Sequence, residues 1–250
     1  MKLGLKIWSH NFEHVSIINE LFESKKIDYL EVYTVPKSIK EDVHFLKDLR
    51  LPVVIHAPHA NSGFNIADAK LLNKNIETFY DVKRISDQLN SEIIIVHAGE
   101  YGEIYSALKC LKKLQDDRII IENMPKTALK GEACLGYDTE TLKPFLENSG
   151  GLCLDFGHAI KAAFSLGKDY KKMIEELVKF NPIMFHINDG FDNNPIDEHR
   201  WFGEGNYDLK FLTNFIGKRK VTIETERKGS PFLKENLINL DNLLKTKKDM

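Results

Sequence analysis

The sequence predicts a single (β/α)₈ barrel that spans residues 1–250. Short runs of apolar, often β-branched residues recur along the chain without strict alternation, which is typical of parallel strands buried on both faces. Segments with helical spacing of apolar residues separate these runs. Eight repeats of this strand–helix alternation fit within 250 residues, close to the ~250 of one closed barrel. We therefore expect one domain.

The predicted elements follow directly from the runs. The eight strands are expected at Leu3–Trp8, Tyr29–Thr34, Pro52–His59, Glu92–Gly99, Arg118–Pro125, Gly151–His158, Ile183–Gly190 and Lys220–Arg227. One long helix is predicted by the apolar spacing of Leu72, Ile76, Phe79, Val82, Ile85 and Leu89. The next helix is predicted by Tyr105, Leu108, Leu111 and Leu114. Ser230-Pro231 predicts the start of the last helix, with a serine N-cap and a proline in the first turn.

Composition excludes several classes of protein. The net charge of −2 does not fit a basic nucleic-acid binder as a whole, although the field of one face and its metals can differ from the total. No stretch reaches the ~18 apolar residues of a membrane span. The N-terminal residues 1–6 are too charged for a signal peptide. The three cysteines form no close metal pair and no disulfide framework, so we expect a cytoplasmic enzyme.

Histidines and carboxylates gather where the predicted strands end. Most members of this set lie at the C-terminal end of a run or just past it: His56, His97, Glu122, Asp155, His158, His186, Asp197, His199 and Glu224. The C-terminal rim is the face on which barrels of this kind carry their active sites. Burying so many ionisable groups together is costly unless cations compensate them. Imidazole and carboxylate ligands suit zinc, manganese or iron(II), so the set predicts a metal centre.

Two motifs carry a resemblance to a known family. They are Gly151-Leu-Cys-Leu-Asp155-Phe-Gly-His158, and Asp197-Glu-His199 followed by Gly203-Glu-Gly205. With them, nearly the whole chain resembles the xylose-isomerase-like barrel superfamily, and within it the endonuclease IV family of abasic-site nucleases. The resemblance implies a metal-dependent hydrolase that cleaves the phosphodiester backbone of DNA at abasic or damaged sites.

The resemblance also implies which residues share each metal, for up to three Zn²⁺ ions. One ion would be held by His56, His97 and Glu122. A second would be held by Glu122, Asp155, His186 and Glu224, with Glu122 bridging the two. A third would be held by His158, Asp197 and His199. Such a cluster suits phosphodiester hydrolysis because close cations activate water at neutral pH and neutralise a leaving oxygen. Glu122 and Glu224 are the carboxylates expected to orient the nucleophile.

An isomerase or epimerase is the alternative that the same residues leave open. Sugar and sugar-phosphate isomerases of the superfamily share the core of Glu122, Asp155, His186 and Glu224, and hold one metal, commonly Mn²⁺. In that case Glu122 and Glu224 would shuttle a proton beside a carbonyl. The nuclease family's glycine-alanine-histidine-valine-serine signature in strand one is replaced here by Lys6-Ile-Trp-Ser-His10-Asn. Asp197 and His199 together favour three metals instead.

Substrate contacts are predicted at the rim as well. His10 and Glu31 are expected to face it, and His59 stands where the nuclease family has an aromatic residue after alanine and proline. Arg200 and Trp201, beside His199 and before Phe202, can fill the gap that a flipped-out sugar leaves in a duplex, or else cover the barrel mouth. The expected partner is DNA with an abasic site, or a small sugar or sugar phosphate in the alternative.

Overall fold

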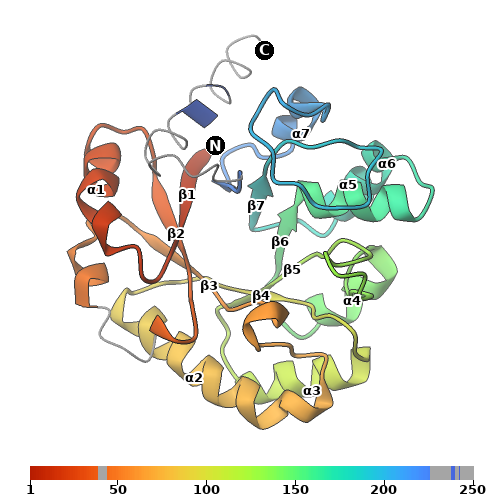
Figure 1. Cartoon of the computed structure of the whole chain (residues 1–250), viewed down its shortest axis with the longest axis horizontal. Helices are drawn as coiled ribbons and strands as arrows, with labels where there is room; N and C mark the ends of the chain where they lie inside the picture. The colour runs from red at the N-terminus through yellow and green to blue at the C-terminus, as the bar shows by residue number, and fades with distance from the viewer. Residues whose placement is uncertain (39–43, 226–237, 240–241, 243–250) are drawn as a thin grey trace.

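The computed structural model describes residues 1–38, 44–225, 238, 239 and 242. Eight parallel strands close into a barrel in the order β1-β2-β3-β4-β5-β6-β7-β8 (Figure 1), which confirms the predicted fold. The strands are β1 Lys2–Trp8, β2 Tyr29–Tyr33, β3 Val53–His56, β4 Ile94–His97, β5 Ile119–Glu122, β6 Leu152–Asp155, β7 Met184–Ile187 and β8 Lys220–Ile223. The predicted end of the eighth run and the helix start at Ser230-Pro231 lie outside the described residues.

Helices surround the barrel (Figure 1). The α-helices are α1 Val15–Glu23, α2 Leu72–Gln88, α3 Ile104–Leu114, α4 Thr139–Leu146, α5 Phe156–Ser165, α6 Tyr170–Val178 and α7 Leu209–Asn214. Short 3₁₀ helices are η1 Phe12–His14, η3 His44–Asp48, η4 Ala60–Ser62 and η5 Ala69–Leu71. Within the described part of the chain, no helix combines the length and apolar character needed to cross a bilayer.

The buried faces of α2 and α3 test the predicted helical spacing. In α2, Phe79, Val82 and Ile85 are buried as expected. In α3, Leu111 and Leu114 are buried, but Tyr105 is 75% exposed, so its assignment to the buried face is wrong. A strict spacing of three residues rotates by about 60° per step around a helix with 3.6 residues per turn. Tyr105 has therefore rotated out of the stripe that packs on the barrel.

The predicted sixth strand, Gly151–His158, is two elements in the structure. β6 ends at Asp155 and α5 begins at Phe156, so His158 lies in the first turn of a helix and not in a strand. The carboxylate of Asp155 caps this helix by accepting a hydrogen bond from the backbone N–H of His158 at 2.8 Å. An apolar run alone does not distinguish a buried strand from a buried helix, which is why the sequence missed the boundary.

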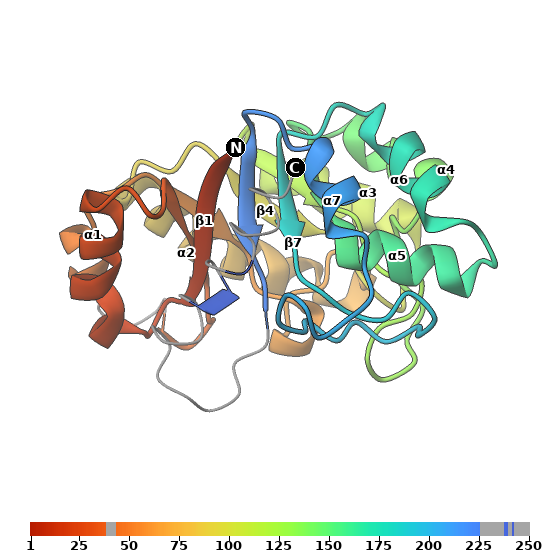
Figure 2. The ribbon, with the colours of Figure 1, turned by 90° about the horizontal axis from the view of Figure 1, so that it is seen from above.

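The barrel interior is built in layers. Side chains alternate between the two faces of a strand, and one inner layer is apolar: Tyr29, Val54, Ile93, Ile95, Ile120, Cys153 and Met184. Two residues further along several of these strands, the same side of the chain carries ionisable groups: Glu31, His56, His97, Glu122, Asp155 and His186. The alternation that builds the core thus places a charged layer at the C-terminal end, beside the loops at the lower edge of Figure 2.

Candidate metal centre

The first group of candidate ligands joins three neighbouring strands. His56 ends β3, His97 ends β4 and Glu122 ends β5. Glu122 Oε2 lies 2.9 Å from His56 Nε2 and 3.2 Å from His97 Nε2, near the ~3.3 Å that separates neighbouring ligands of a tetrahedral zinc ion. His56 Nδ1 lies 2.8 Å from the carbonyl oxygen of Ala57. Donation to that oxygen leaves the lone pair of Nε2 directed at Glu122.

His59 joins this group from the loop after β3. Its ring stacks on that of His97 with centroids 4.2 Å apart. The ligand atoms of His56, His59 and His97 all lie within 4.8 Å of one another. Burial, with His97 and His56 adding to it, holds the pKa of His59 well below its ordinary value, so the ring is neutral and able to bind metal. The substrate role predicted for His59 stays a prediction.

The second group comes from the C-terminal ends of β5 to β8. Atoms of Glu122, Asp155, His186 and Glu224 all lie within 4.8 Å of one another. His186 Nδ1 is 3.1 Å from Glu122 Oε1, 3.1 Å from Glu224 Oε1 and 3.7 Å from Asp155 Oδ2. Asp155 Oδ2 is buried with no hydrogen-bond partner among the described residues. A buried acceptor left in this state is costly, and a divalent ion among these carboxylates would provide the missing partner. The donor set therefore fits a metal.

The third group combines a helix with a loop. His158, in the first turn of α5, places Nε2 3.4 Å from Asp197 Oδ2, and His199 Nε2 lies 2.6 Å from the same oxygen. Their Nδ1 atoms lie 2.8 Å from the carbonyl oxygen of Asn123 and 2.6 Å from that of Glu224. Both rings are thereby oriented with Nε2 toward Asp197. Burial lowers the pKa of His199, but Asp197 and Glu224 outweigh it and raise that pKa to about 9.

The loop that carries Asp197 and His199 is fixed by Asp189, a buried residue just after β7. Its carboxylate accepts hydrogen bonds from the backbone N–H groups of Gly203 at 2.8 Å and Gly205 at 3.1 Å. A Cβ added at Gly205 would lie 2.2 Å from the carbonyl oxygen of Gly190, so the chain passes itself here too closely for any side chain. Figure 2 shows this blue loop projecting beyond the strand ends.

Lys6 is part of the site, and the sequence analysis did not assign it a role. Its Nζ lies 3.0 Å from Glu31 Oε1 and is hydrogen-bonded to Glu224 Oε1. Glu31 is fully buried and lies beneath His186, whose Nε2 is 2.9 Å away. Because Glu31 is buried here, a role in orienting His186 is favoured, in preference to the contact with substrate that was predicted for Glu31. A lysine in the middle of the apolar strand Leu3–Trp8 was the signal that could have pointed to it.

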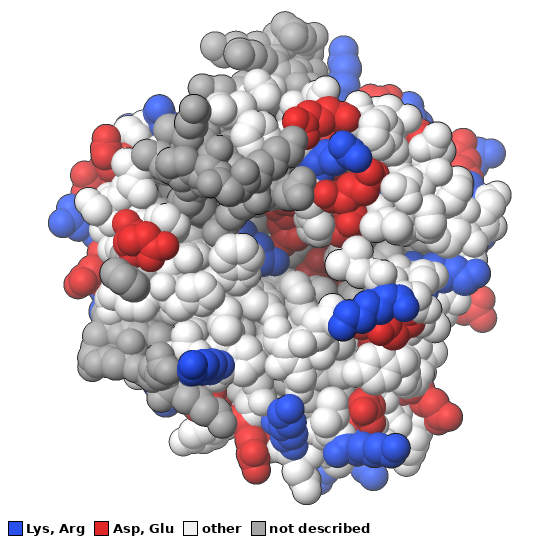
Figure 3. Space-filling view, in the orientation of Figure 1, with Lys and Arg blue, Asp and Glu red and all other residues white. Residues whose placement is uncertain are grey.

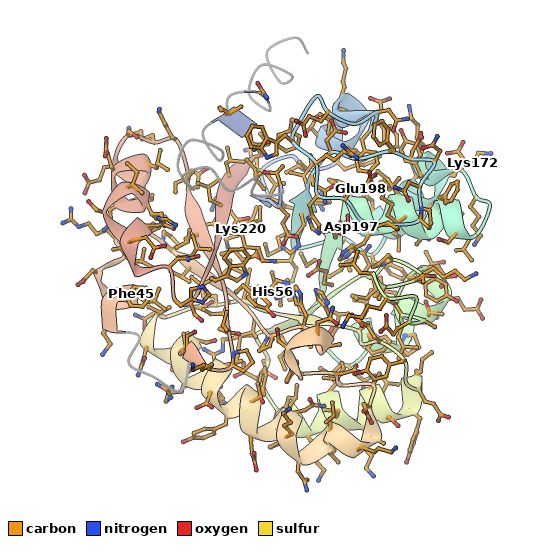
Figure 4. All side chains as sticks on the ribbon, in the orientation of Figure 1. Phe45, His56, Lys172, Asp197, Glu198 and Lys220 are labelled. Carbon is orange, nitrogen blue, oxygen red and sulfur yellow. The ribbon has the colours of Figure 1, made fainter. Side chains whose placement is uncertain are left out.

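A pocket of about 130 Å³ opens over the three groups. Figure 3 shows a hollow near the centre of this face with charged atoms inside it, and Figure 4 places His56 and Asp197 near the barrel axis, far from the peripheral Lys172. Part of the pocket wall comes from the loop after β5, through residues such as Met124 and Leu129. Lys6 and His59 also line the pocket.

The remaining predicted substrate contacts lie outside the lining of this pocket. His10 is exposed and stacks on Trp8 with ring centroids 6.2 Å apart. Arg200 pairs with Glu198 at 2.9 Å and is half-buried. Trp201 is half-buried in the same loop. Their contact with a substrate stays a prediction, and it applies to a ligand larger than the pocket.

A family model described as a xylose isomerase-like TIM barrel matches residues 10–245. The chain belongs to this family. An uncharacterized protein of Methanocaldococcus jannaschii is 24% identical over 220 residues, which cover 80% of this chain and 69% of that protein. A probable endonuclease 4 of Carboxydothermus hydrogenoformans is 25% identical over 242 residues, which cover 83% of this chain and 80% of the relative.

Solved structures share the fold. Endonuclease IV from Thermus thermophilus has a TM-score of 0.73 and 19% identity, with all of both chains covered. A D-tagatose 3-epimerase-like protein has a TM-score of 0.68 and 22% identity, with 100% of this chain and 99% of that chain covered. At these identities the likeness concerns the barrel alone. The residues of the site must therefore carry any argument about chemistry.

Proposed function

We propose that the protein is a divalent-metal-dependent phosphodiester hydrolase that cleaves DNA at abasic or damaged sites. The observation that supports this best is the group of His158, Asp197 and His199, whose rings converge on one oxygen of Asp197 beside the other two ligand groups. An isomerase that uses one metal needs no such group. Similarity to relatives named probable endonuclease 4 points the same way. Zinc is the proposed metal because the third group holds two imidazoles and one carboxylate.

The carboxylate of Glu122 links the first two groups. Its Oε2 faces His56 and His97, and its Oε1 faces His186, as a bridging ligand requires. Ions bound there would provide a water nucleophile at neutral pH and offset the charge on the phosphoryl oxygens. Glu224 lines the pocket, and we propose that it accepts a hydrogen bond from the attacking water.

We propose that the third group would hold the ion that neutralises the leaving oxygen. Asp197 and His199 line the same pocket as Glu224. His199 presents its Nε2 to Asp197, while its Nδ1 is hydrogen-bonded to the carbonyl oxygen of Glu224. This hydrogen bond joins the third ligand group to the second. The pocket holds about 130 Å³, which is far too small for a duplex. We propose that the DNA strands would lie across the rim, near His10, Arg200 and Trp201.

A sugar or sugar-phosphate isomerase is the second candidate, and one observation favours it. Glu122 Oε1 and Glu224 Oε1 each lie 3.1 Å from the same nitrogen of His186. A proton shuttle across a carbonyl needs two carboxylates close to one metal site. The proposed ion in that case is Mn²⁺ held by the second group alone.

One experiment separates the two candidates. Protein loaded with Zn²⁺ or Mn²⁺ is incubated with a labelled duplex that carries a single abasic site, and in parallel with ketoses and their phosphates in deuterated water. We expect metal-dependent cleavage 5′ to the abasic site, lost in Glu122→Ala. Binding of the duplex should weaken steeply with salt, because counterions are released from a polyanion. Absence of cleavage together with deuterium exchange into a ketose would overturn the proposal in favour of the isomerase.

A further inference from the structure

Four ionisable side chains from four neighbouring strands of the barrel form a closed ring at the pocket. Lys6 Nζ contacts Glu31 Oε1 at 3.0 Å, and Glu31 Oε2 lies 2.9 Å from His186 Nε2. His186 Nδ1 lies 3.1 Å from Glu224 Oε1, which is hydrogen-bonded back to Lys6. The ring therefore joins β1 and β2 to β7 and the end of β8. One of its members, Glu224, also belongs to the second ligand group.

Lys6 brings a positive charge into a place where carboxylates gather. Burial opposes that charge, but Glu224 and Glu31 outweigh burial and raise the pKa of Lys6 above its ordinary value. Atoms of Glu31, His56 and Glu224 lie within 4.8 Å of one another, so this corner of the barrel has the donors of a cation site. The ammonium group lies against two of those three residues.

The carboxylates of the centre are Glu31, Glu122, Asp155, Asp197 and Glu224, which carry five negative charges when ionised. Three dications would contribute six positive charges, and Lys6 adds a seventh. Two dications and Lys6 together carry five positive charges, which balance the five carboxylates. Lys6 thus neutralises negative charge that would otherwise attract a further dication to the second ligand group. It also binds the Glu224 oxygen that faces His186.

We propose that Lys6 is a positioning residue that gives the metal centre one fixed positive charge and thereby weakens divalent-metal binding by Glu122, Asp155, His186 and Glu224. The proposal rests on the metal centre described under the proposed function. It predicts that this group fills last among the three. A metal that binds there would share Glu224 Oε1 with the ammonium group of Lys6, so the two positive charges would repel each other.

Zinc affinity in two variants of opposite charge tests this proposal. Lys6→Met removes a positive charge while keeping the length of the side chain, and Glu31→Gln removes a negative charge while keeping an acceptor for His186. Each protein is stripped and titrated with Zn²⁺ against a chromophoric chelator. We expect the weakest site to bind about tenfold or more tightly in Lys6→Met, and about tenfold more weakly in Glu31→Gln. If the substitutions acted only by loosening the site, zinc binding would instead weaken in both variants.

Lys220→Met is the matched control, because Lys220 begins β8 at the opposite end of the barrel. Its zinc affinities should equal those of the wild type. Far-UV circular dichroism shows whether each variant is folded, and Glu31→Gln keeps the proposal testable if Lys6→Met is not. Unchanged or weaker binding in folded Lys6→Met, or unchanged or tighter binding in Glu31→Gln, would overturn the inference.

The readout does not involve a substrate, so the two proposals can fail separately. Opposite shifts in zinc affinity without DNA cleavage would support the role of Lys6 and reject the nuclease. Cleavage of abasic DNA without those shifts would support the nuclease and reject the role of Lys6. A wild-type protein that binds no Zn²⁺ would reject both.

Discussion

His186 and Glu31 form a buried pair beneath the candidate metal centre, with Nε2 and Oε2 2.9 Å apart. A carboxylate on the inner nitrogen keeps the proton there when Nδ1, which faces Glu122 and Glu224, gives up its own proton to a metal. Glu31 itself accepts a second hydrogen bond from the hydroxyl of Thr222 at 2.7 Å. Glu31 thereby determines which nitrogen of the ring is left to bind a metal.

Metal content should report the third group directly. We expect protein purified without chelator to contain about three zinc ions per chain and His199→Ala about two, because Asp197 and His158 alone leave too few donors. Elemental analysis of the purified proteins measures this. His14→Ala, a half-buried histidine at the end of η1, is the control and should keep the wild-type content. Equal content in His199→Ala and the wild type would mean that the third group binds no metal.

Glu224→Gln should lower the turnover rate by about 10²–10⁴, the usual range for a positioned acid–base group. The substitution preserves shape but removes the negative charge that both enzyme candidates need. The rate is measured on abasic duplex and on the ketose panel. Lys112→Gln changes an exposed residue of α3 and should leave the rate unchanged. Near-wild-type activity in Glu224→Gln would place the active centre elsewhere.

The fold was predictable from the sequence because it depends on local patterns, and the same patterns single out the ionisable residues that end the strands. Parallel strands buried on both faces appear as apolar runs, and a ligand such as His56 or Glu122 stands out at the end of one. Lys6 and Glu31 are paired in register across β1 and β2. The contact of Lys6 with Glu224 depends on the closure of the barrel, which brings β1 beside β8. No pattern within one run contains that information.

Loop conformation was the other part beyond sequence reasoning. Residues around Asp197 carry no periodicity, and their path is set by the buried carboxylate of Asp189 and by His199 in a left-handed conformation with φ of 47°. Both features depend on contacts between residues more than ten positions apart. The prediction that Arg200 and Trp201 face a substrate could not account for the pairing of Arg200 with Glu198.

Zinc binding by the third group should strengthen with pH. The pKa of His199 is raised to about 9, so this ring is protonated at neutral pH and must lose its proton to bind metal. For each proton that zinc displaces, its affinity is therefore expected to rise about tenfold per pH unit and to level off near pH 9. Chelator-buffered zinc titrations between about pH 6 and 9.5 measure the slope.

The metal-free protein should show the opposite trend in stability. A histidine whose pKa is raised from 6.5 to about 9 in the folded state contributes stability that is fully present below pH 6.5 and lost as pH rises through about 9. Zinc-loaded protein should lose less over that window. Thermal unfolding of both forms across the window checks this, and a steeper loss in the zinc-loaded form would contradict it.

The hydrogen bonds that Asp189 accepts from the loop carrying Asp197 and His199 should affect zinc binding. In Asp189→Asn, an amide N–H₂ group replaces one carboxylate oxygen and meets either the N–H groups of Gly203 and Gly205 or those on the other side of the carboxylate. One set of donors loses its acceptor, the loop shifts, and Asp197 moves relative to His158. We expect zinc affinity of the third group to fall about tenfold or more, as for other changes behind a ligand. Chelator competition measures that fall.

Asp192→Asn is the matched control for this loop. The carboxylate of Asp192 accepts a hydrogen bond from the side chain of Asn206 at 2.9 Å, near the surface and away from the ligands. Its zinc affinities should stay at the wild-type values. Gly205→Ala provides an independent variant, because its Cβ would lie 2.2 Å from the Gly190 carbonyl oxygen and displace the same loop without altering charge. If Asp189→Asn and Gly205→Ala both bind zinc as the wild type does, the loop does not govern the third group.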